Sequence, residues 1–174
     1  MSFDWSKVEF KDEKRFLSNM YPCEIKFEIN EKLKSLFPNV DFDGEVYGSS
    51  EHIYMAMKSK SKVWQKKIRD LDEPRKTKTL SRKALKTDIL FETEDHFILR
   101  DDWDEIKVEV MRAILYLKFA QNKDLQDKLL SIDGYIEERN DWGDVFWGTD
   151  DGVGKNMLGI CLMEVRAYFQ DGFK

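Results

Sequence analysis

The residues best suited to chemistry gather in one stretch near the C-terminal end of the chain. Residues 135–166 contain two tryptophans, five glycines and six carboxylates that precede a Gly-x-Gly turn, and an apolar segment follows. Carboxylates, indoles and a glycine loop with exposed backbone N–H groups could bind and hydrolyse a small anionic, aromatic ligand. The same residues also suit a structural role, in which Trp142 and Trp147 belong to the core and Gly152 and Gly154 make a turn. The stretch alone does not decide between these roles.

A second candidate group lies in the segment GSSEHIYMAMK. Ser49 or Ser50 is suited to begin a helix there as its N-cap. Glu51 then falls in the first turn, where the helix dipole stabilises a carboxylate as an anion, so it suits a base or charge stabiliser better than a proton donor. Lys58 follows seven residues later on the same face, about 10 Å along the helix axis. The structural alternative is that Glu51 is only a favourable first-turn acid.

Helices are predicted where apolar residues recur every three or four positions, and these helices must position the two groups. They cover the segment after Ser49, a segment that Pro74 begins or breaks, and segments that start near residues 101–102, 122–124 and 156. The residues expected to face the core are Ile53, Met57, Trp64, Ile68, Ile106, Val110, Ile114, Leu117, Leu125, Leu129, Leu130, Leu158, Leu162, Val165 and Phe169.

Trp103 lies at the start of the helix predicted after residues 101–102, outside its apolar stripe. Its ring could stack on a flat ligand there, or it could pack the helix end onto the core as a staple.

The strands are predicted to be short. Alternation over residues 25–29 indicates a half-buried strand, and Val46–Tyr47 indicates another. Phe16–Leu17 is expected to be extended and to enter a turn, which leaves Asn19 in a loop where its amide could contact a ligand. Residues 87–96 are expected to form a loop or a short strand.

The composition indicates one globular domain over residues 1–174 with a modest net charge of −5. A negative net charge argues against strong nonspecific binding to nucleic acid. Residues 58–86 nevertheless contain twelve Lys or Arg residues and three acids. A phosphate-rich partner could bind there, or the segment could be a solvated basic helix face.

The remaining composition restricts compartment and metal binding. No apolar run approaches a membrane span and the N-terminal residues show no secretion signal, so we expect a cytoplasmic protein without a membrane partner. Cys23 and Cys161 are far apart and are expected to be free thiols. With His52 and His96 as the only histidines, no metal site is expected. The oligomeric state is left open.

Six segments of the chain, in order and with ordinary spacing, resemble the NADAR family, also called YbiA-like proteins. They are FLSNMYPC at Phe16–Cys23, YGSSEHIYMAMK at Tyr47–Lys58, LRDDWDEIKVEVM at Leu99–Met111, LKFAQN at Leu117–Asn122, EERNDWGDVFWG at Glu137–Gly148 and GVGKNMLGICLMEVR at Gly152–Arg166. The segment TKTLSRKAL departs from the family pattern, because it keeps Lys78 and Arg82 but has Ser81 where a glycine is usual.

The resemblance implies an α+β fold, a single helix-rich domain with a small antiparallel sheet. It also implies an N-glycosidase that cleaves a ribose C1′–N bond without a cofactor or metal. The implied phosphorylated ribosyl substrates are phosphoribosyl aminopyrimidine intermediates of riboflavin synthesis or ADP-ribosylated guanine, the latter in a nucleotide or in nucleic acid. The alternative from another functional class is a non-catalytic module that binds ADP-ribose or NAD.

This chemistry gives the candidate residues their roles. Cleavage passes through a ribosyl cation, so Glu51 is expected to stabilise the cation or activate water, with Asp144 as the second acid. Lys58 could bind phosphate, attack C1′ or pair with Glu51. The expected substrate contacts are Trp103 and Trp147 on the base, Glu138 and Asn140 on the ribose hydroxyls, Gly154, Asn156 and Arg82 on phosphate, and the amide of Asn19 on a ligand edge. Together these residues are expected to line one pocket.

Overall fold

A computed structural model describes residue 10, residues 12–86 and residues 97–171. The loop or strand expected at residues 87–96 therefore lies outside the described residues. The chain divides into two compact units. We refer to residues 19–121 as the 19–121 unit, and to residues 1–18 together with residues 122–174 as the terminal unit.

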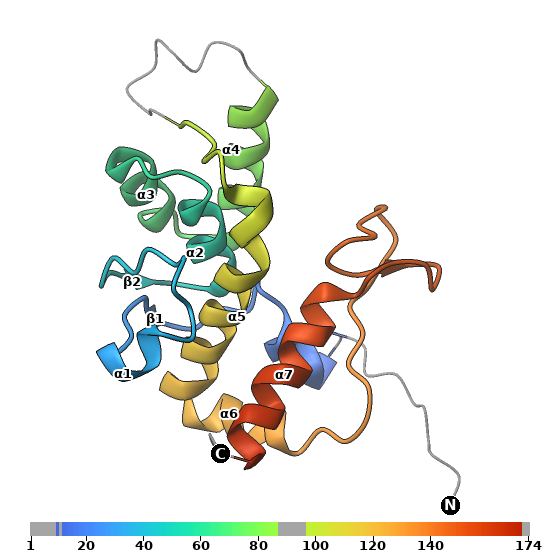
Figure 1. Ribbon diagram of the computed structural model, residues 1–174. Helices are drawn as coiled ribbons and strands as arrows, with labels where there is room; N and C mark the ends of the chain where they lie inside the picture. The colour runs from blue at the N-terminus through green and yellow to red at the C-terminus, as the bar shows by residue number, and fades with distance from the viewer. Residues whose placement is uncertain (1–9, 11, 87–96, 172–174) are drawn as a thin grey trace, which may run out of the picture. The chain divides into compact units, whose positions relative to one another are not determined.

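Helix α2 (Ser50–Met57) is the buried helix of the 19–121 unit, and all eight of its residues are buried. It contacts α3 (Lys62–Arg69), α4 (Pro74–Lys86) and α5 (Trp103–Gln121), which Figure 1 shows around it. The N-cap is Ser49, whose hydroxyl accepts a hydrogen bond from the backbone N–H of His52 at 3.3 Å. A helix buried on every side has little need for an amphipathic pattern, so its polar residues are conspicuous.

The helical pattern that starts after Ser49 is divided between two helices. Residues 58–61 separate α2 from α3, and Ser61 caps α3 by accepting a hydrogen bond from the N–H of Trp64 at 3.3 Å. The four residues predicted to face the core are all buried: Ile53, Met57, Trp64 and Ile68. The break directly follows α2, so Lys58 is its C-cap residue.

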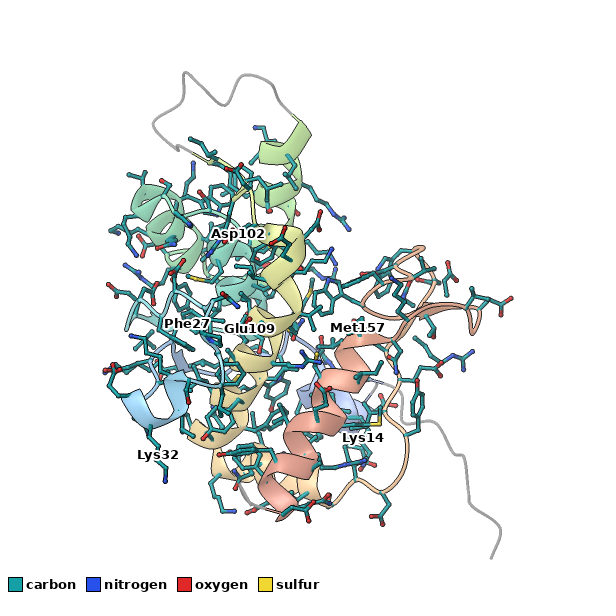
Figure 2. All side chains as sticks on the ribbon, in the orientation of Figure 1. Lys14, Phe27, Lys32, Asp102, Glu109 and Met157 are labelled. Carbon is teal, nitrogen blue, oxygen red and sulfur yellow. The ribbon has the colours of Figure 1, made fainter. Side chains whose placement is uncertain are left out.

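Helix α5 is the longest helix among the described residues and forms where the sequence predicts it. Its predicted apolar face is buried, at Ile106, Val110, Ile114 and Leu117. Asp102 precedes its first residue (Figure 2), and the carbonyl of Asp102 accepts hydrogen bonds from the N–H groups of Glu105 and Ile106. The carboxylate of Asp102 instead binds the Arg100 guanidinium at 2.8 and 2.9 Å.

The 19–121 unit also contains the predicted antiparallel sheet. Strands β1 (Ile25–Lys26) and β2 (Val46–Tyr47) pair Ile25 with Tyr47, and the short helix α1 (Glu31–Lys34) lies between them in sequence. Phe27 (Figure 2) is fully buried just beyond β1, and its ring contacts Phe42. The helix-rich α+β class with a small antiparallel sheet is thus confirmed.

The terminal unit consists of η1 (Asp12–Leu17), α6 (Lys123–Leu130), β3 (Arg139–Asn140), β4 (Thr149–Asp150) and α7 (Met157–Asp171). The extended conformation predicted at Phe16–Leu17 is wrong, because both residues belong to the 3-10 helix η1 and their side chains are buried on it. Strands β3 and β4 form a parallel pair that the sequence does not predict. Most of the core residues predicted on α6 and α7 are buried: Leu125, Leu129, Leu158, Leu162 and Val165. Leu130 and Phe169 were also predicted to face the core, but both are only half-buried.

Candidate functional site

The buried polar face of α2 carries Glu51, whose residue surface is only 6% exposed. Its backbone N–H lies in the first turn of the helix and donates to the carbonyl of Asn19 at 2.9 Å. This hydrogen bond holds the loop at Asn19 against the N-terminus of α2. A buried carboxylate loses its hydration and must gain compensating interactions from the protein.

Lys58 interacts electrostatically with Glu51, as their spacing on one helix face predicts. Burial is the largest influence on the Lys58 amine and lowers its pKa, whereas the negative charge of Glu51 acts in the opposite direction. The nearby positive charges of Lys78, Arg82 and Lys107 lower this pKa further. An amine of lowered pKa beside a carboxylate is a combination that enzymes use in nucleophilic and acid–base chemistry.

The cations around Lys58 come from two further helices. Lys78 and Arg82 belong to α4, and Lys107 belongs to α5, where its ammonium binds the Asp104 carboxylate at 2.6 Å. Lys107 was not among the predicted site residues. Its spacing of four residues from Trp103 was the available signal, because one helix turn brings the two to neighbouring positions.

Tyr54 and Trp103 form the aromatic part of this cluster. Their ring centroids are 5.0 Å apart with the planes tilted by 57°, and the Lys58 ammonium lies 5.4 Å from the centroid of the Tyr54 ring. Trp103 is only 7% exposed, so its ring packs the start of α5 onto α2 as the staple alternative expects. Tyr54 was missed from sequence because an aromatic residue on a buried helix is ordinary core.

The backbone carbonyl of Asn19 accepts the Glu51 N–H, whereas one side-chain atom of Asn19 has no hydrogen-bond partner in the described part of the chain. Its side-chain amide donates to the Met111 sulfur at 3.5 Å. Its Oδ1 atom is buried and has no hydrogen-bond partner among the described residues. A buried acceptor in that state is costly unless a water or a ligand satisfies it.

An open groove of about 520 Å³ lies elsewhere on the 19–121 unit. It is lined by Ser59, Lys60, Ser61, Ile98, Leu99, Arg100, Asp101 and Asp102. None of the predicted site residues lines it, although the N–H of Arg100 donates to the Lys58 carbonyl at 2.9 Å. We therefore base the candidate site on the α2 face and not on this groove.

In the terminal unit, Asn140 and Asp144 organise a turn. The Asn140 side-chain oxygen accepts the Asp144 N–H at 3.0 Å, and its amide donates to the carbonyls of Asp144 and Thr149. The Asp144 Oδ1 atom accepts the N–H groups of Phe146 and Trp147 at 3.1 and 2.9 Å. Its Oδ2 atom accepts no hydrogen bond from any residue that the structure describes. These two residues therefore fix the backbone of the turn in this structure.

Asn156 ties the start of α7 to the strand region. Its side-chain oxygen accepts the Glu138 N–H at 2.9 Å, and its amide donates to the Tyr135 hydroxyl and the Ile136 carbonyl at 3.0 and 2.8 Å. The side chain is 1% exposed and its backbone has a φ of 50°. Both polar atoms of the amide are thus engaged within the protein.

The backbone N–H groups before α7 also have protein partners. Those of Lys155, Asn156, Met157 and Leu158 donate to the carbonyls of Val145, Gly148, Phe146 and Trp147 at 2.8–3.2 Å. Gly154 allows this close approach, because a Cβ atom there would lie 2.3 Å from the Gly148 carbonyl oxygen. The geometry therefore explains the glycine by chain packing and does not favour the anion nest expected from sequence.

Glu138 and Trp147 complete the predicted residues of the terminal unit, and both are half-buried. The Glu138 carbonyl accepts the Thr149 N–H at 2.8 Å. The Trp147 ring meets the Phe146 ring edge to face at 5.1 Å.

The eleven predicted residues thus fall into two groups. Asn19, Glu51, Lys58, Arg82 and Trp103 belong to the 19–121 unit, and Glu138, Asn140, Asp144, Trp147, Gly154 and Asn156 belong to the terminal unit. Within the first group, the charges of Glu51 and Arg82 both influence the pKa of Lys58, in opposite directions. The single pocket expected to contain all of them stays a prediction.

The structure describes residue 10, residues 12–86 and residues 97–171. Within them, no three His, Cys, Asp or Glu side chains come together in a way that could hold a metal ion. None of the described helices has the length and apolar character needed to cross a bilayer.

Curated proteins with related sequences include enzymes and pathway proteins. A riboflavin biosynthesis protein of Vibrio vulnificus is 33% identical over 157 residues, which cover 90% of this chain but only 36% of that protein. The N-glycosidase YbiA of Escherichia coli is 30% identical over 128 residues, which cover 73% of each chain. The chain therefore spans about a third of the first relative and most of the second.

The fold has a solved counterpart. The NMR structure of the E. coli protein YbiA matches with a TM-score of 0.72 and 26% sequence identity, covering 97% of this chain and 88% of that one. The predicted YbiA-like fold is confirmed by this match. The model of the NADAR domain matches residues 5–170, and the chain accordingly belongs to the NADAR family.

Proposed function

We propose that this protein is an N-glycosidase that hydrolyses the bond between a ribose C1′ and a nitrogen base. The observation that carries the proposal is the interaction of the buried Glu51 carboxylate with the Lys58 amine, beside three further cations. The E. coli and Nostoc punctiforme relatives are named N-glycosidases, which supports the same reaction.

Glu51 is suited to the positive charge that develops during cleavage. When the C1′–N bond breaks, its electron pair leaves with the base and the ribose becomes cation-like. A carboxylate preorganised in a water-poor site can stabilise such charge by roughly several kcal/mol. Its position in the first turn of α2 favours the ionised form.

Lys58 has two alternative roles beside Glu51. Its amine can attack C1′, forming a C–N bond that water later hydrolyses, and its lowered pKa favours the neutral form that this step needs. Alternatively, its ammonium can pair with Glu51 and orient the carboxylate. Asp144 is kept as the proposed second acid, through its Oδ2 atom. In either case the departing base gains a proton and water adds to C1′.

The best candidates to bind the substrate phosphate are the cationic side chains near Lys58. Lys78 and Arg82 of α4 share the electrostatic surroundings of Lys58, and charge attraction would direct an anionic substrate there. Gly154 and Asn156 were also predicted to bind phosphate, but the N–H groups of residues 155–158 already donate to carbonyls of the protein. For the base, Trp147 is half-buried and has more accessible surface than Trp103.

We propose a phosphoribosyl aminopyrimidine as the substrate, ahead of ADP-ribosylated guanine. The Vibrio and Arabidopsis relatives are named riboflavin biosynthesis proteins, which supports the metabolite. The basic segment at residues 58–86 is the observation that favours a nucleic-acid substrate. Cys23 and Cys161 form no disulfide in the structure, which suits the cytoplasm, where we place the reaction.

Salt dependence separates the two substrates. A nucleic acid held by six to ten phosphate contacts would lose about 10³–10⁵ in affinity between 50 and 200 mM salt. We expect the Michaelis constant for the metabolite to change less than about tenfold over that range, because few charges are neutralised. A steep dependence with an ADP-ribosylated oligonucleotide would instead favour the polymer.

The reaction itself is tested by product analysis. The protein is incubated with a phosphoribosyl aminopyrimidine and, separately, with ADP-ribosylated guanosine, and products are identified by mass spectrometry. The free aminopyrimidine with ribose 5-phosphate, or guanosine with ADP-ribose, supports the proposal. Saturable binding of both compounds without any product would support the non-catalytic ADP-ribose-binding module instead.

A further inference from the structure

Tyr54 occupies a distinctive place on α2, between the candidate catalytic pair. It follows Glu51 by three residues and precedes Lys58 by four, so the three side chains share one helix face. The Lys58 ammonium lies 5.4 Å from the centroid of the Tyr54 ring. This distance is within the range in which the negative face of an aromatic ring attracts a cation.

The Tyr54 ring is itself fixed by its surroundings. It is 6% exposed, and the buried Trp103 ring lies 5.0 Å away at an angle of 57°. A ring that is buried in this way offers little surface on which a substrate base could stack. Its influence on a reaction therefore has to pass through the side chain that it holds.

We infer that Tyr54 is a positioning residue, whose ring holds the Lys58 amine in place relative to Glu51. This inference rests on the proposed function of Glu51 and Lys58. Tyr54 would restrict the conformation of Lys58, which neither Glu51 nor Lys58 does. A four-carbon lysine side chain at a helix C-terminus otherwise has many rotamers. The ring limits these rotamers, and Trp103 limits the ring.

The Tyr54 ring also influences the protonation of Lys58. The ring face favours the ammonium form, as does Glu51 on the same helix, whereas burial, Lys78 and Arg82 on α4, and Lys107 on α5 favour the neutral amine. Weakening the ring face should therefore lower the pKa of Lys58 further. A ring that merely filled space would leave this pKa unchanged when its electron density alone is altered.

The test replaces Tyr54 by phenylalanine and by phenylalanines with one, two and three ring fluorines. Fluorination withdraws electron density from the ring face with little change in shape, and all members of the series lack the hydroxyl. The Lys58 side chain is followed by NMR titration in ¹³C-lysine-labelled protein, and its signal is identified by its absence in Lys58→Arg. We expect the pKa of Lys58 to fall stepwise, by about half a unit or more over the series.

Activity provides the second readout. Tyr54→Leu should lower kcat with a smaller effect on KM, and Tyr54→Phe should restore it, because the positioned amine acts in the chemical step. Phe37→Leu is the matched control, since Phe37 is a buried ring of the same unit that contacts Tyr116 and not Lys58. It should leave both the Lys58 pKa and kcat unchanged.

The outcomes separate this inference from the proposed function. An identical Lys58 pKa throughout the fluorinated series overturns the inference, whatever the activity. A stepwise fall supports the ring contact even when no substrate is cleaved, in which case only the proposed reaction is lost. Equal losses of kcat in Tyr54→Leu and Phe37→Leu would also overturn it, because general loosening of the core would then be sufficient.

Discussion

At the scale of residues, the protein buries charged groups that a stable core does not need. Glu51 is 6% exposed, and Lys118 on α5 is completely buried. Removing a charged group from water costs free energy that pairing recovers only in part. Charged residues that are buried despite this cost often have a functional role. For Glu51, the interaction with Lys58 indicates a role in catalysis.

Trp103 allows its two alternatives to be separated by substitution. Because its ring is 7% exposed and packs on Tyr54, we expect Trp103→Ala to destabilise the protein by about 3–5 kcal/mol. Chemical denaturation measures this change. The matched control is Trp142→Ala, whose ring is 59% exposed and should cost less than about 1 kcal/mol. An unchanged unfolding free energy with a raised KM would contradict packing and support stacking on the base.

Lys118 makes the stability depend on pH at the alkaline side. Burial lowers its pKa from the ordinary 10.5 to about 8, and Cys23 acts weakly in the opposite direction. Between pH 8 and 10.5 the unfolded chain therefore binds more protons than the folded protein, so this group makes the unfolding free energy rise with pH. Below pH 8 the lysine is charged in both states, so the unfolding free energy no longer depends on pH through this group and the cost of burying its charge is fully present.

Between pH 8 and 10.5 we expect the unfolding free energy of the wild type to rise by on the order of 3 kcal/mol relative to that of Lys118→Met. Urea denaturation of both proteins at several pH values measures the difference, and other titrating groups cancel in the comparison. Lys34→Met, which removes an exposed lysine, should show no such pH dependence. A difference between wild type and Lys118→Met that stays constant from pH 8 to 10 would show that the lowered pKa is wrong.

At the scale of elements, the start of α7 is organised by close contact between chain segments. Four N–H groups of residues 155–158 donate to carbonyls of residues 145–148, and the side chains of Asn140 and Asp144 fix the turn from which these carbonyls come. The glycines and polar residues of the stretch therefore build one scaffold in the structure. Their predicted contacts with substrate are additional to that scaffold.

Gly154 tests how tightly this scaffold is packed. In Gly154→Ala the new methyl group would lie 2.3 Å from the Gly148 carbonyl oxygen, at a φ of 153°. We expect a loss of about 2–4 kcal/mol in unfolding free energy, measured by denaturation. Gly152→Ala is the matched control, because its φ of 78° is also unfavourable but its Cβ would meet nothing within 4 Å. It should cost about 1–2 kcal/mol, and equal losses would rule out the packing explanation.

At the scale of the whole molecule, the sequence predicts the helices better than it predicts their breaks. The 3.6-residue apolar pattern identifies the buried face of α5 correctly, since that periodicity follows directly from helix geometry. The break between α2 and α3 falls within a continuous apolar spacing, so only the local cap at Ser61 reveals it. The parallel pair β3–β4 consists of two-residue polar strands, which show no apolar alternation that would predict them.

The candidate site shows the same division. The interaction of Glu51 with Lys58 follows from positions on one helix and was predictable. Tyr54 lies on the same face of α2 and contacts Lys58, but the sequence does not distinguish it from ordinary core. Lys107 acts on Lys58 from α5, and the sequence does not distinguish it from ordinary surface. The NADAR model covers residues 5–170 and thus both compact units. The expected single domain and the shared pocket stay predictions.

Glu51 is the residue on which the proposed cleavage of a C1′–N bond most depends. The most direct measurement is the rate of base release from a phosphoribosyl aminopyrimidine by wild type, Glu51→Gln and the control Glu105→Gln, which changes an exposed acid on α5. We predict that Glu51→Gln lowers kcat/KM by about a hundredfold or more with an unchanged thermal midpoint, and that the control retains wild-type activity. A folded Glu51→Gln protein that releases the base at the wild-type rate would contradict the account.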